Sequence, residues 1–362
     1  MKQHPRQFVN EIIVRFYQRV CYAICGLAAI ALLSACSPWP AALDPLVDYQ
    51  QRIAKTLEQE PVAYQSVEVP RIPEVRQLTV AIPRVSISLT DSWRIDQCAA
   101  GNLIARRNSA LGKLEEGLSR LHTDVLLVEA MQDCVNELRS KDSSLADRMA
   151  EALAKKKANL AAEQAHALAT DEALRHALRV GADTLAEADP DRFANALSAL
   201  GTVLQLLKSD VLNGKTDAPA VPSRDQIDEA MEILYQSNYL PYLWRTLFEQ
   251  EAYLRRLQPM LDNLVEASGC SSDSTPERAH VLHDVFNTVF IEQVQPQLAS
   301  FTEQGYVANE SLSELNAEIN SPKLTAYLKE LTEISEQLNQ ATKAHVQSWQ
   351  DFFAACNFAV GD

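Results

Sequence analysis

Apolar side chains recur every three or four positions through most of this chain, which is the spacing of one face of an α-helix. The first such row follows Asp44-Pro45 and consists of Leu46, Tyr49, Ile53 and Leu57. An acidic residue followed by proline is typical of a helix start, with the acid as N-cap and the proline in the first turn. The pattern therefore predicts a first helix with Asp44 as its N-cap.

The longest row lies near the C-terminus. Ser321-Pro322 is a second start signal, and a heptad follows it: Leu324, Leu331, Leu338, His345 and Phe352. A helix over this row, at 1.5 Å per residue, spans roughly 50 Å. We therefore expect an all-α fold, an elongated helical bundle with long antiparallel helices.

Residues 61–90 interrupt the helical pattern. Prolines exclude a continuous helix there, and the segment 78–89 is rich in β-branched residues. The prolines are Pro61, Pro70, Pro73 and Pro83. This composition predicts a short extended N-terminal arm laid on the helices, with an edge strand as one form of it.

The rest of the pattern predicts two helical halves. A helical hairpin over about 91–138 precedes an Ala-rich stretch over 143–207, where sparse leucines predict shorter or more exposed helices. Residues 213–223 have the composition of a linker. The N-terminal half then covers 44–212 and the C-terminal half 224–362, and the two can form one continuous domain.

Composition and charge exclude two broad classes. Of the 362 residues 47% are hydrophobic, which excludes disorder of the whole chain. The 48 acidic residues outnumber the 33 basic ones, the net charge is −15, and no dense basic run occurs. These features argue against a nucleic-acid partner.

The first 36 residues have the layout of a bacterial lipoprotein signal. Basic residues precede an apolar run from Cys21 to Ala35. This run is shorter than the roughly 20 residues of a membrane-spanning helix, so a permanent transmembrane anchor is the weaker interpretation. The run ends in Leu33-Ser34-Ala35-Cys36, which resembles the lipobox, where the chain is cut before a cysteine that carries lipid. We predict a signal peptide over 1–35, lipidation at Cys36 and a tether over 36–43. An ordinary cleaved signal that happens to contain a cysteine is the alternative.

The residue after the lipobox bears on location. It is Ser37 rather than aspartate, and by resemblance to Gram-negative sorting signals this implies an outer-membrane protein that faces the periplasm. Two or three acyl chains hold a protein stably in a bilayer. Without residues 1–35 the chain has 29 basic and 47 acidic residues, a net charge of −18, which disfavours electrostatic adhesion to anionic lipid. The expected partners are the membrane, through the N-terminal lipid, and an envelope protein.

Four cysteines remain in the mature chain, and in an oxidising compartment they indicate two disulfides with three possible pairings. A hairpin turn within 108–117 would bring Cys98 level with Cys134, so we favour that pair, which leaves Cys270 for Cys356. A four-cysteine zinc site is the lesser alternative, because no C-x-x-C pair occurs.

Two groups of side chains are candidates for ligand binding. Arg106, Arg107, Asn108 and Lys113 gather at the hairpin turn, where they could grip a carboxylate or phosphate. We favour a structural role, in which Asn108 caps the helix end and the cations complement its dipole. His345 and Trp349 lie four residues apart on the last helix and are expected in the core; the alternative is a ligand pocket between the hairpin and this helix.

The sequence has no hydrolase, metalloprotease or nucleotide-binding motif, so we predict no catalytic residue, no metal and no cofactor. His280, His283 and Asp284 have helical spacing for a metal but no visible third strong ligand. We interpret them as solvated surface residues.

Several local strings follow one another in a fixed order: Ile87-Ser88-Leu89 before Cys98; Arg107-Asn108-Ser109 with Leu111-Gly112-Lys113; Gln295-Pro296 with Leu298-Ala299; and His345 with Trp349-Gln350 and Cys356. Together they resemble one family of proteobacterial lipoproteins, the domain of unknown function 3080. Their order and spacing carry the resemblance, which covers nearly the whole mature chain and is weakest over about 143–220. It implies a lipoprotein with no established activity and transfers no catalytic residue.

Two hypotheses of different class follow. The first is a non-enzymatic envelope lipoprotein, a helical scaffold or partner-binding module on the periplasmic face of the outer membrane. The second is a periplasmic enzyme or a binder of small anionic ligands that uses the Arg107, Asn108 and Lys113 turn. The missing motifs and the acidic surface favour the first.

Overall fold

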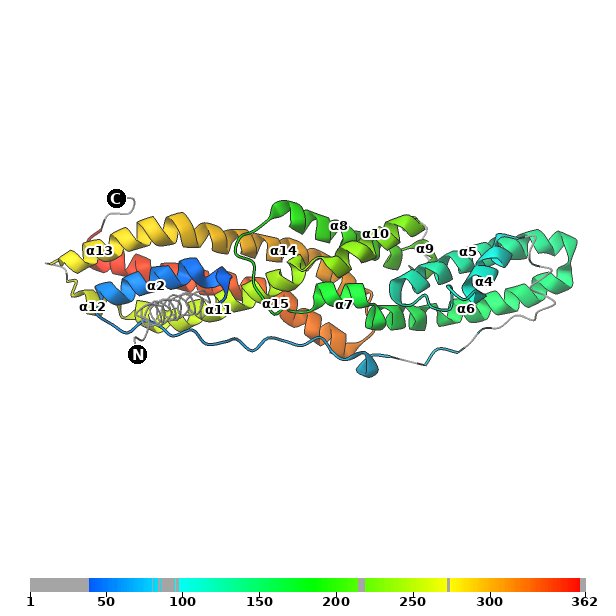
Figure 1. The fold of residues 1–362 in the computed structure, drawn as a ribbon, viewed down its shortest axis with the longest axis horizontal. Coiled ribbons are helices and arrows are strands. Elements are labelled where there is room, and N and C mark those ends of the chain that lie inside the picture. The colour runs from blue at the N-terminus through cyan, green and yellow to red at the C-terminus, as the bar shows by residue number, and fades with distance from the viewer. Residues whose placement is uncertain are drawn as a thin grey trace, which may run out of the picture. The chain divides into compact units, whose positions relative to one another are not determined.

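The computed structural model of the chain describes residues 39–79, 81–83, 85, 95, 98–213, 219–271 and 274–358. The predicted signal peptide and Cys36 lie outside these residues. The chain divides into two compact units, Met1–Ala41 and Ala42–Asp362. The second unit holds all the helices from α2 to α15 (Figure 1).

The second unit is built from helices. Its first part contains α2 Asp44–Thr56, α4 Ala99–Asn108, α5 Gly117–Lys141, α6 Ser143–Thr170, α7 Glu172–Leu178, α8 Pro190–Leu207 and α9 Asp210–Asn213. Its second part contains α10 Arg224–Gln236, α11 Tyr239–Asp262, α12 Leu264–Ser268, α13 Glu277–Val285, the π-helix η3 Phe286–Val294, α14 Gln295–Ala317 and α15 Pro322–Ala355. Short 3-10 turns are η1 Ala41–Leu43 and η2 Val75–Gln77. The described residues form no β-strand, so the predicted all-α bundle is confirmed.

The predicted helix starts are confirmed with one correction. α15 begins at Pro322, and the whole heptad row of its apolar face is buried. At the first helix Asp44 is not the N-cap, because the η1 turn leads directly into α2 and leaves Leu43 at the cap position. The proline remains in the first turn, where its missing N–H leaves no helical hydrogen bond unmade.

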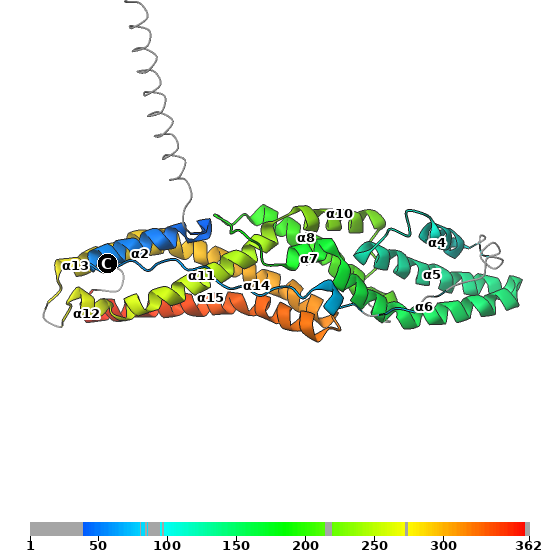
Figure 2. The same cartoon turned by 60° about the horizontal axis from the view of Figure 1, so that its bottom comes forward.

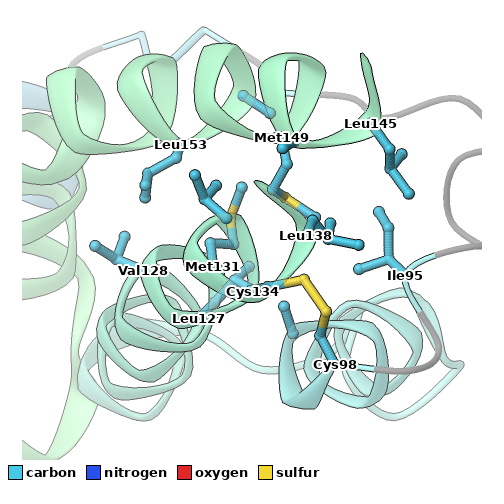
Figure 3. Packing of buried hydrophobic residues seen from close by; sticks show 14 of the residues in the cluster. Ile95, Cys98, Leu127, Val128, Met131, Cys134, Leu138, Leu145, Met149 and Leu153 are labelled. Carbon is cyan, nitrogen blue, oxygen red and sulfur yellow. A yellow bond between two sulfur atoms is a disulfide. The ribbon is translucent and has the colours of Figure 1, made fainter. Parts of the chain in front are cut away.

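The predicted helical hairpin is present, and a third helix extends it. α4 packs on α5, and α5 packs along nearly its full length on α6 (Figure 1). Leu127, Met131, Leu138, Met149 and Leu153 fill the space between α5 and α6 (Figure 3). The disulfide between Cys98 and Cys134 joins α5 to the chain just before α4 and is one of the two predicted.

The sequence predicts shorter or more exposed helices over the Ala-rich stretch, and the first of these alternatives is wrong for α6. This helix has 28 residues, and Leu145, Met149, Leu153 and Leu160 form a buried stripe along it. Alanine has the highest helix propensity, so the stretch stays helical although its large apolar residues are sparse. The Asp142 carboxylate caps the start by accepting from the amide of Leu145 at 3.1 Å.

In the second part of the unit, α11, α14 and α15 pack on one another. α7, α8 and α10 form a group beside them, and α2 lies against α13 and η3 (Figures 1 and 2). None of the described helices contains a stretch that is both long and apolar enough to span a bilayer.

The predicted extended arm is present between α2 and η2 and has no strand partner among the described residues. Side chains of the helices hold it through polar contacts. The Tyr64 hydroxyl donates to Glu249 at 3.1 Å, and the Arg175 guanidinium donates to the Pro73 carbonyl at 2.8 Å. Arg256 contacts the Gln65 carbonyl in the same way, at 2.6 Å. The part of the arm that the structure describes therefore lies on the helices, whereas the edge strand expected over 78–89 falls partly outside the described residues.

Candidate functional site

A chain of four alternating charges lies between the helices of the hairpin. The Arg107 guanidinium contacts the Asp124 carboxylate through two nitrogens, at 2.9 and 3.3 Å. Lys156 Nζ lies 3.2 Å from Asp124 and 2.6 Å from Glu163. The side chains of Asp124 and Lys156 are only 3% and 8% exposed. Buried charges are stable when they are paired, and these four side chains have no net charge together.

Burial acts on the outermost acid of this chain. It raises the pKa of the Glu163 carboxyl, and the hydrogen bond from Lys156 offsets part of that rise. The ion pairs from Arg107 to Glu163 thus link α4, α5 and α6. Breaking one of them would leave a buried charge without a partner, which costs free energy of folding.

A second charged group fastens the turn of the hairpin to α10. Arg224 Nη1 lies 3.1 Å from the Glu115 carboxylate, and its Nε donates to Asp228 at 2.9 Å. Arg106 lies 3.7 Å from the same Glu115 carboxylate and is half exposed. Thr123 Oγ1 donates to Glu115 at 2.9 Å, so this carboxylate is the shared acceptor of the group.

The predicted cations of the turn therefore differ in their surroundings. Arg107 is paired inside the hairpin, and Arg106 shares a carboxylate with α10. Asn108 is the last residue of α4 and exposed, with Ser109 rather than Asn108 at the C-cap position. Lys113 is exposed. An anion at this turn would meet Lys113 and the free edge of Arg106, while Arg107 would have to leave Asp124.

The second predicted group, on the last helix, lies in an aromatic core. His345 is fully buried, its Nε2 is 3.0 Å from the Tyr49 hydroxyl, and its ring stacks on Phe290 with 4.6 Å between centroids. Trp349 is also fully buried and packs against Phe286 with 4.9 Å between centroids. The expectation that both residues belong to the core matches their burial.

This aromatic core keeps its polar groups neutral. Burial lowers the pKa of His345 to about 3, so the imidazole is uncharged at neutral pH. Burial raises the pKa of the Tyr49 hydroxyl well above its usual value, and Trp349 offsets part of the rise. Among the described residues, His345 Nδ1 and Trp349 Nε1 have no partner with hydrogen-bond geometry.

The backbone around the aromatic core is unusual. Phe286 and Phe290 belong to η3, a π-helix of nine residues, and their rings stack with 5.2 Å between centroids. π-helical turns are rare and frequent at functional sites. The second predicted disulfide, Cys270–Cys356, closes the same end, and Thr275 Oγ1 donates to the Cys356 carbonyl at 2.8 Å.

The structure does not bring the two predicted groups together. The C-terminal half of α15, which carries His345 and Trp349, lies at the end of the unit with α2 and α13, whereas α4 lies at the other end (Figure 1). One small cavity is lined by residues of α6, α15 and the segments beside them, among them Leu78, Leu168, Ile319 and Leu324. Its volume is about 30 Å³, which is room for about one water molecule.

The side chains of His280 and His283 pack against the aromatic ring of Phe358. Phe358 lies edge-on to His280, with 5.3 Å between centroids, and stacks on His283 at 4.6 Å. The described residues contain no group of three histidine, cysteine or acidic side chains arranged to hold a metal ion.

Sequence reasoning missed a buried polar row on α11. Glu249 and Gln250 are fully buried, and each has a side-chain oxygen without a partner among the described residues. The other Glu249 oxygen accepts from Arg245 at 2.5 Å and from Tyr64. The charge pattern offered one signal, because Arg245 and Glu249 have the spacing of a helical ion pair.

Comparison with known proteins identifies a family. A family model described as "Protein of unknown function (DUF3080)" matches residues 46–360. No curated protein and no solved structure matches the chain. Because the matched residues cover nearly all of the helical unit, this chain belongs to the DUF3080 family of proteins of unknown function.

Proposed function

We propose that this protein is a lipid-anchored envelope protein, held on the periplasmic face of the outer membrane by acyl chains on Cys36. In this proposal the helical unit is a non-enzymatic scaffold or partner-binding module. The observation that carries the proposal is Leu33-Ser34-Ala35-Cys36 at the end of an apolar run that follows basic residues.

The start of the helical unit supports the anchor. The Ala42 amide donates to Thr184 Oγ1 at 3.2 Å, and Gln250 Nε2 donates to the Ala42 carbonyl at 3.4 Å. Five residues separate Cys36 from Ala42, and an extended chain covers at most about 3.5 Å per residue. An anchor at Cys36 would therefore keep the first helix within about 20 Å of the lipid headgroups.

The state of the polar groups supports a role in binding rather than catalysis. The buried charges of the hairpin pair with one another, and the buried His345 is hydrogen-bonded to Tyr49 between aromatic rings. A general base needs a reactive group beside a space for substrate, and neither group lines the small cavity next to α6.

The test compares two cysteine substitutions in the full chain. Cys36→Ala removes the proposed lipid site, and Cys25→Ala, in the same apolar run, is the matched control. We expect metabolic labelling with palmitate and sedimentation with outer membranes for the natural chain and for Cys25→Ala, and loss of both for Cys36→Ala. A natural chain that is cut, unlabelled and released would establish the ordinary signal peptide instead.

Crosslinking in native envelopes then tests the module. We expect one envelope protein to co-purify with the natural chain and to be lost with Cys36→Ala. An anchored chain that captures no partner would contradict the scaffold role and favour the binding of a small anion at the hairpin turn.

A further inference from the structure

The turn between α4 and α5 exposes two large apolar side chains. Leu111 is 79% exposed and Leu114 is 75% exposed, more than the other exposed large hydrophobic residues that the structure describes, of which Tyr235 at 58% is next. Single exposed leucines are common on protein surfaces. Two leucines three residues apart in one short turn form a small apolar knob, which we call the leucine turn, residues 109–116.

The leucine turn is held in shape by hydrogen bonds. The Ser109 hydroxyl accepts from the Gly112 amide at 3.0 Å, the Ser109 carbonyl accepts from the Lys113 amide at 3.1 Å, and the Leu111 carbonyl accepts from the Leu114 amide at 3.0 Å. The turn therefore has its own local structure and does not depend on burying its leucines.

The leucine turn also folds back tightly on α4. A side chain at Gly112 would place its Cβ 2.1 Å from the Arg106 carbonyl oxygen, so only glycine fits there. At the other end of the turn, Glu115 is clamped to Arg224 of α10. With both ends held against the unit, Leu111 and Leu114 project into solvent.

Cations accompany the leucines although the protein as a whole is acidic. Lys113 lies between the leucines and is exposed, and the Arg106 side chain is 52% exposed. Leucines that enter the acyl region with lysine and arginine at headgroup level form a combination suited to a bilayer surface. The turn also holds Glu115, which is paired with Arg224 of α10, and the exposed Glu116, so the cations that stand beside the leucines are Lys113 and Arg106.

The leucine turn and the start of α2 lie on the same side of the helical unit. In Figure 2 the loop that joins α4 to α5 and the first turn of α2 lie along the upper edge of the unit, while α15 forms the lower edge. The described chain enters the unit through η1, which leads directly into α2. A bilayer at this edge would meet both.

We propose that the leucine turn inserts Leu111 and Leu114 into the bilayer that carries the Cys36 lipid, as a second contact that sets the orientation of the helical unit. This inference rests on the proposed lipid anchor. A protein partner fits the turn less well, because stable protein interfaces bury about 800 Å² on each side and two leucines supply only a small part of that area. A lipid surface requires no matching pocket.

The experiment measures the depth of the turn in vesicles of phosphatidylethanolamine and phosphatidylglycerol that hold the purified lipidated chain. Leu114→Trp reports on the leucine turn, and Ala326→Trp, at an exposed position of α15, is the matched control with the same native tryptophans. We expect lipids brominated in their acyl chains to quench the Leu114→Trp variant several-fold more than the control. Adding Leu111→Asn to Leu114→Trp should return the quenching to the control level.

Other outcomes overturn the proposal in distinguishable ways. Equal quenching of both tryptophan variants in chains that stay bound through lipid would reject insertion and leave the anchor intact. Chains that carry no lipid and do not bind the vesicles would reject the anchor and the insertion together. Because both leucines are exposed, the substitutions leave the core intact, which unchanged helical circular dichroism would verify.

Discussion

The two ends of the helical unit bury polar groups in opposite ways. Between α5 and α6, Asp124 and Lys156 form an ion pair beside a core of leucines and methionines, and each is stabilised by the opposite charge. At the end with α2 and η3, His345 and Tyr49 lie among aromatic rings and are kept neutral. A disulfide closes each end. The comparison shows two ways in which one chain offsets the cost of burying ionisable side chains. It pairs opposite charges at one end and keeps the groups neutral at the other.

The difference makes each end sensitive to a different change. Removing one member of a charge pair leaves the other buried and uncompensated. His345 and Tyr49 are uncharged at neutral pH, so no buried charge has to be compensated there. In acid, the protein is destabilised because protonation of the buried imidazole is unfavourable in the folded state. The following predictions use this contrast, from the largest expected effect to the smallest.

Asp124→Ala is expected to destabilise the protein most. It removes the carboxylate shared by Arg107 and Lys156, and breaking a buried pair costs about 3–5 kcal/mol. Urea denaturation followed by circular dichroism measures the loss. Asp133→Ala, at an exposed position of the same helix, is the control and should change the free energy of unfolding by less than about 0.5 kcal/mol. Equal effects of the two variants would mean that the buried charges do not stabilise the hairpin.

The aromatic end should give the protein a pH dependence in acid. The pKa of His345 is about 3 in the folded protein and 6.5 in its usual state. The unfolded chain therefore binds the proton first, so the contribution of His345 is complete above pH 6.5 and is lost as the pH falls from 6.5 toward 3. From pH 7.5 to pH 5 the loss amounts to about 2 kcal/mol.

Urea midpoints at several pH values test this dependence. His345→Gln keeps a polar side chain but no titrating group, so the free energy of unfolding should depend less steeply on pH between 5 and 7. If the natural protein and the variant share the same slope, His345 does not titrate in this way.

Lys113→Ala should have the smallest effect, and it separates the two roles proposed for the hairpin turn. Lys113 is exposed, so its loss should change the free energy of unfolding by less than about 0.5 kcal/mol, whereas Arg107→Ala should cost several times more because Asp124 loses a partner. Calorimetric titration with phosphate supplies the second readout. Phosphate binding that disappears in Lys113→Ala without loss of stability would establish an anion site at the turn.

Local patterns in the sequence were sufficient for the elements and for the cysteine pairs. The proline starts of α2 and α15 and the heptad row lie within single helices, where neighbours along the chain decide the outcome. The pairing of Cys98 with Cys134 needed only the position of the hairpin turn. The length of α6 does not follow from its sparse leucines, because the high helix propensity of alanine keeps the stretch helical.

The partners of the candidate side chains could not be predicted in the same way. Arg107 was visible as a cation near a turn, but Asp124, Lys156 and Glu163 come from two other helices. His345 was visible in the heptad row, but Tyr49 lies 296 positions away in the chain. The buried Glu249 was not noticed at all, because charged residues at helical spacing usually lie on the surface.

The sequence alone determined the all-α class, the proline starts of α2 and α15, the two disulfides and the family, since each depends on local spacing or on short strings in order. Only the tertiary structure decided which cations are paired, which histidine is neutral and which leucines remain in solvent. Charge state and exposure depend on the atoms that surround a side chain, and segments far apart in the sequence supply most of those atoms.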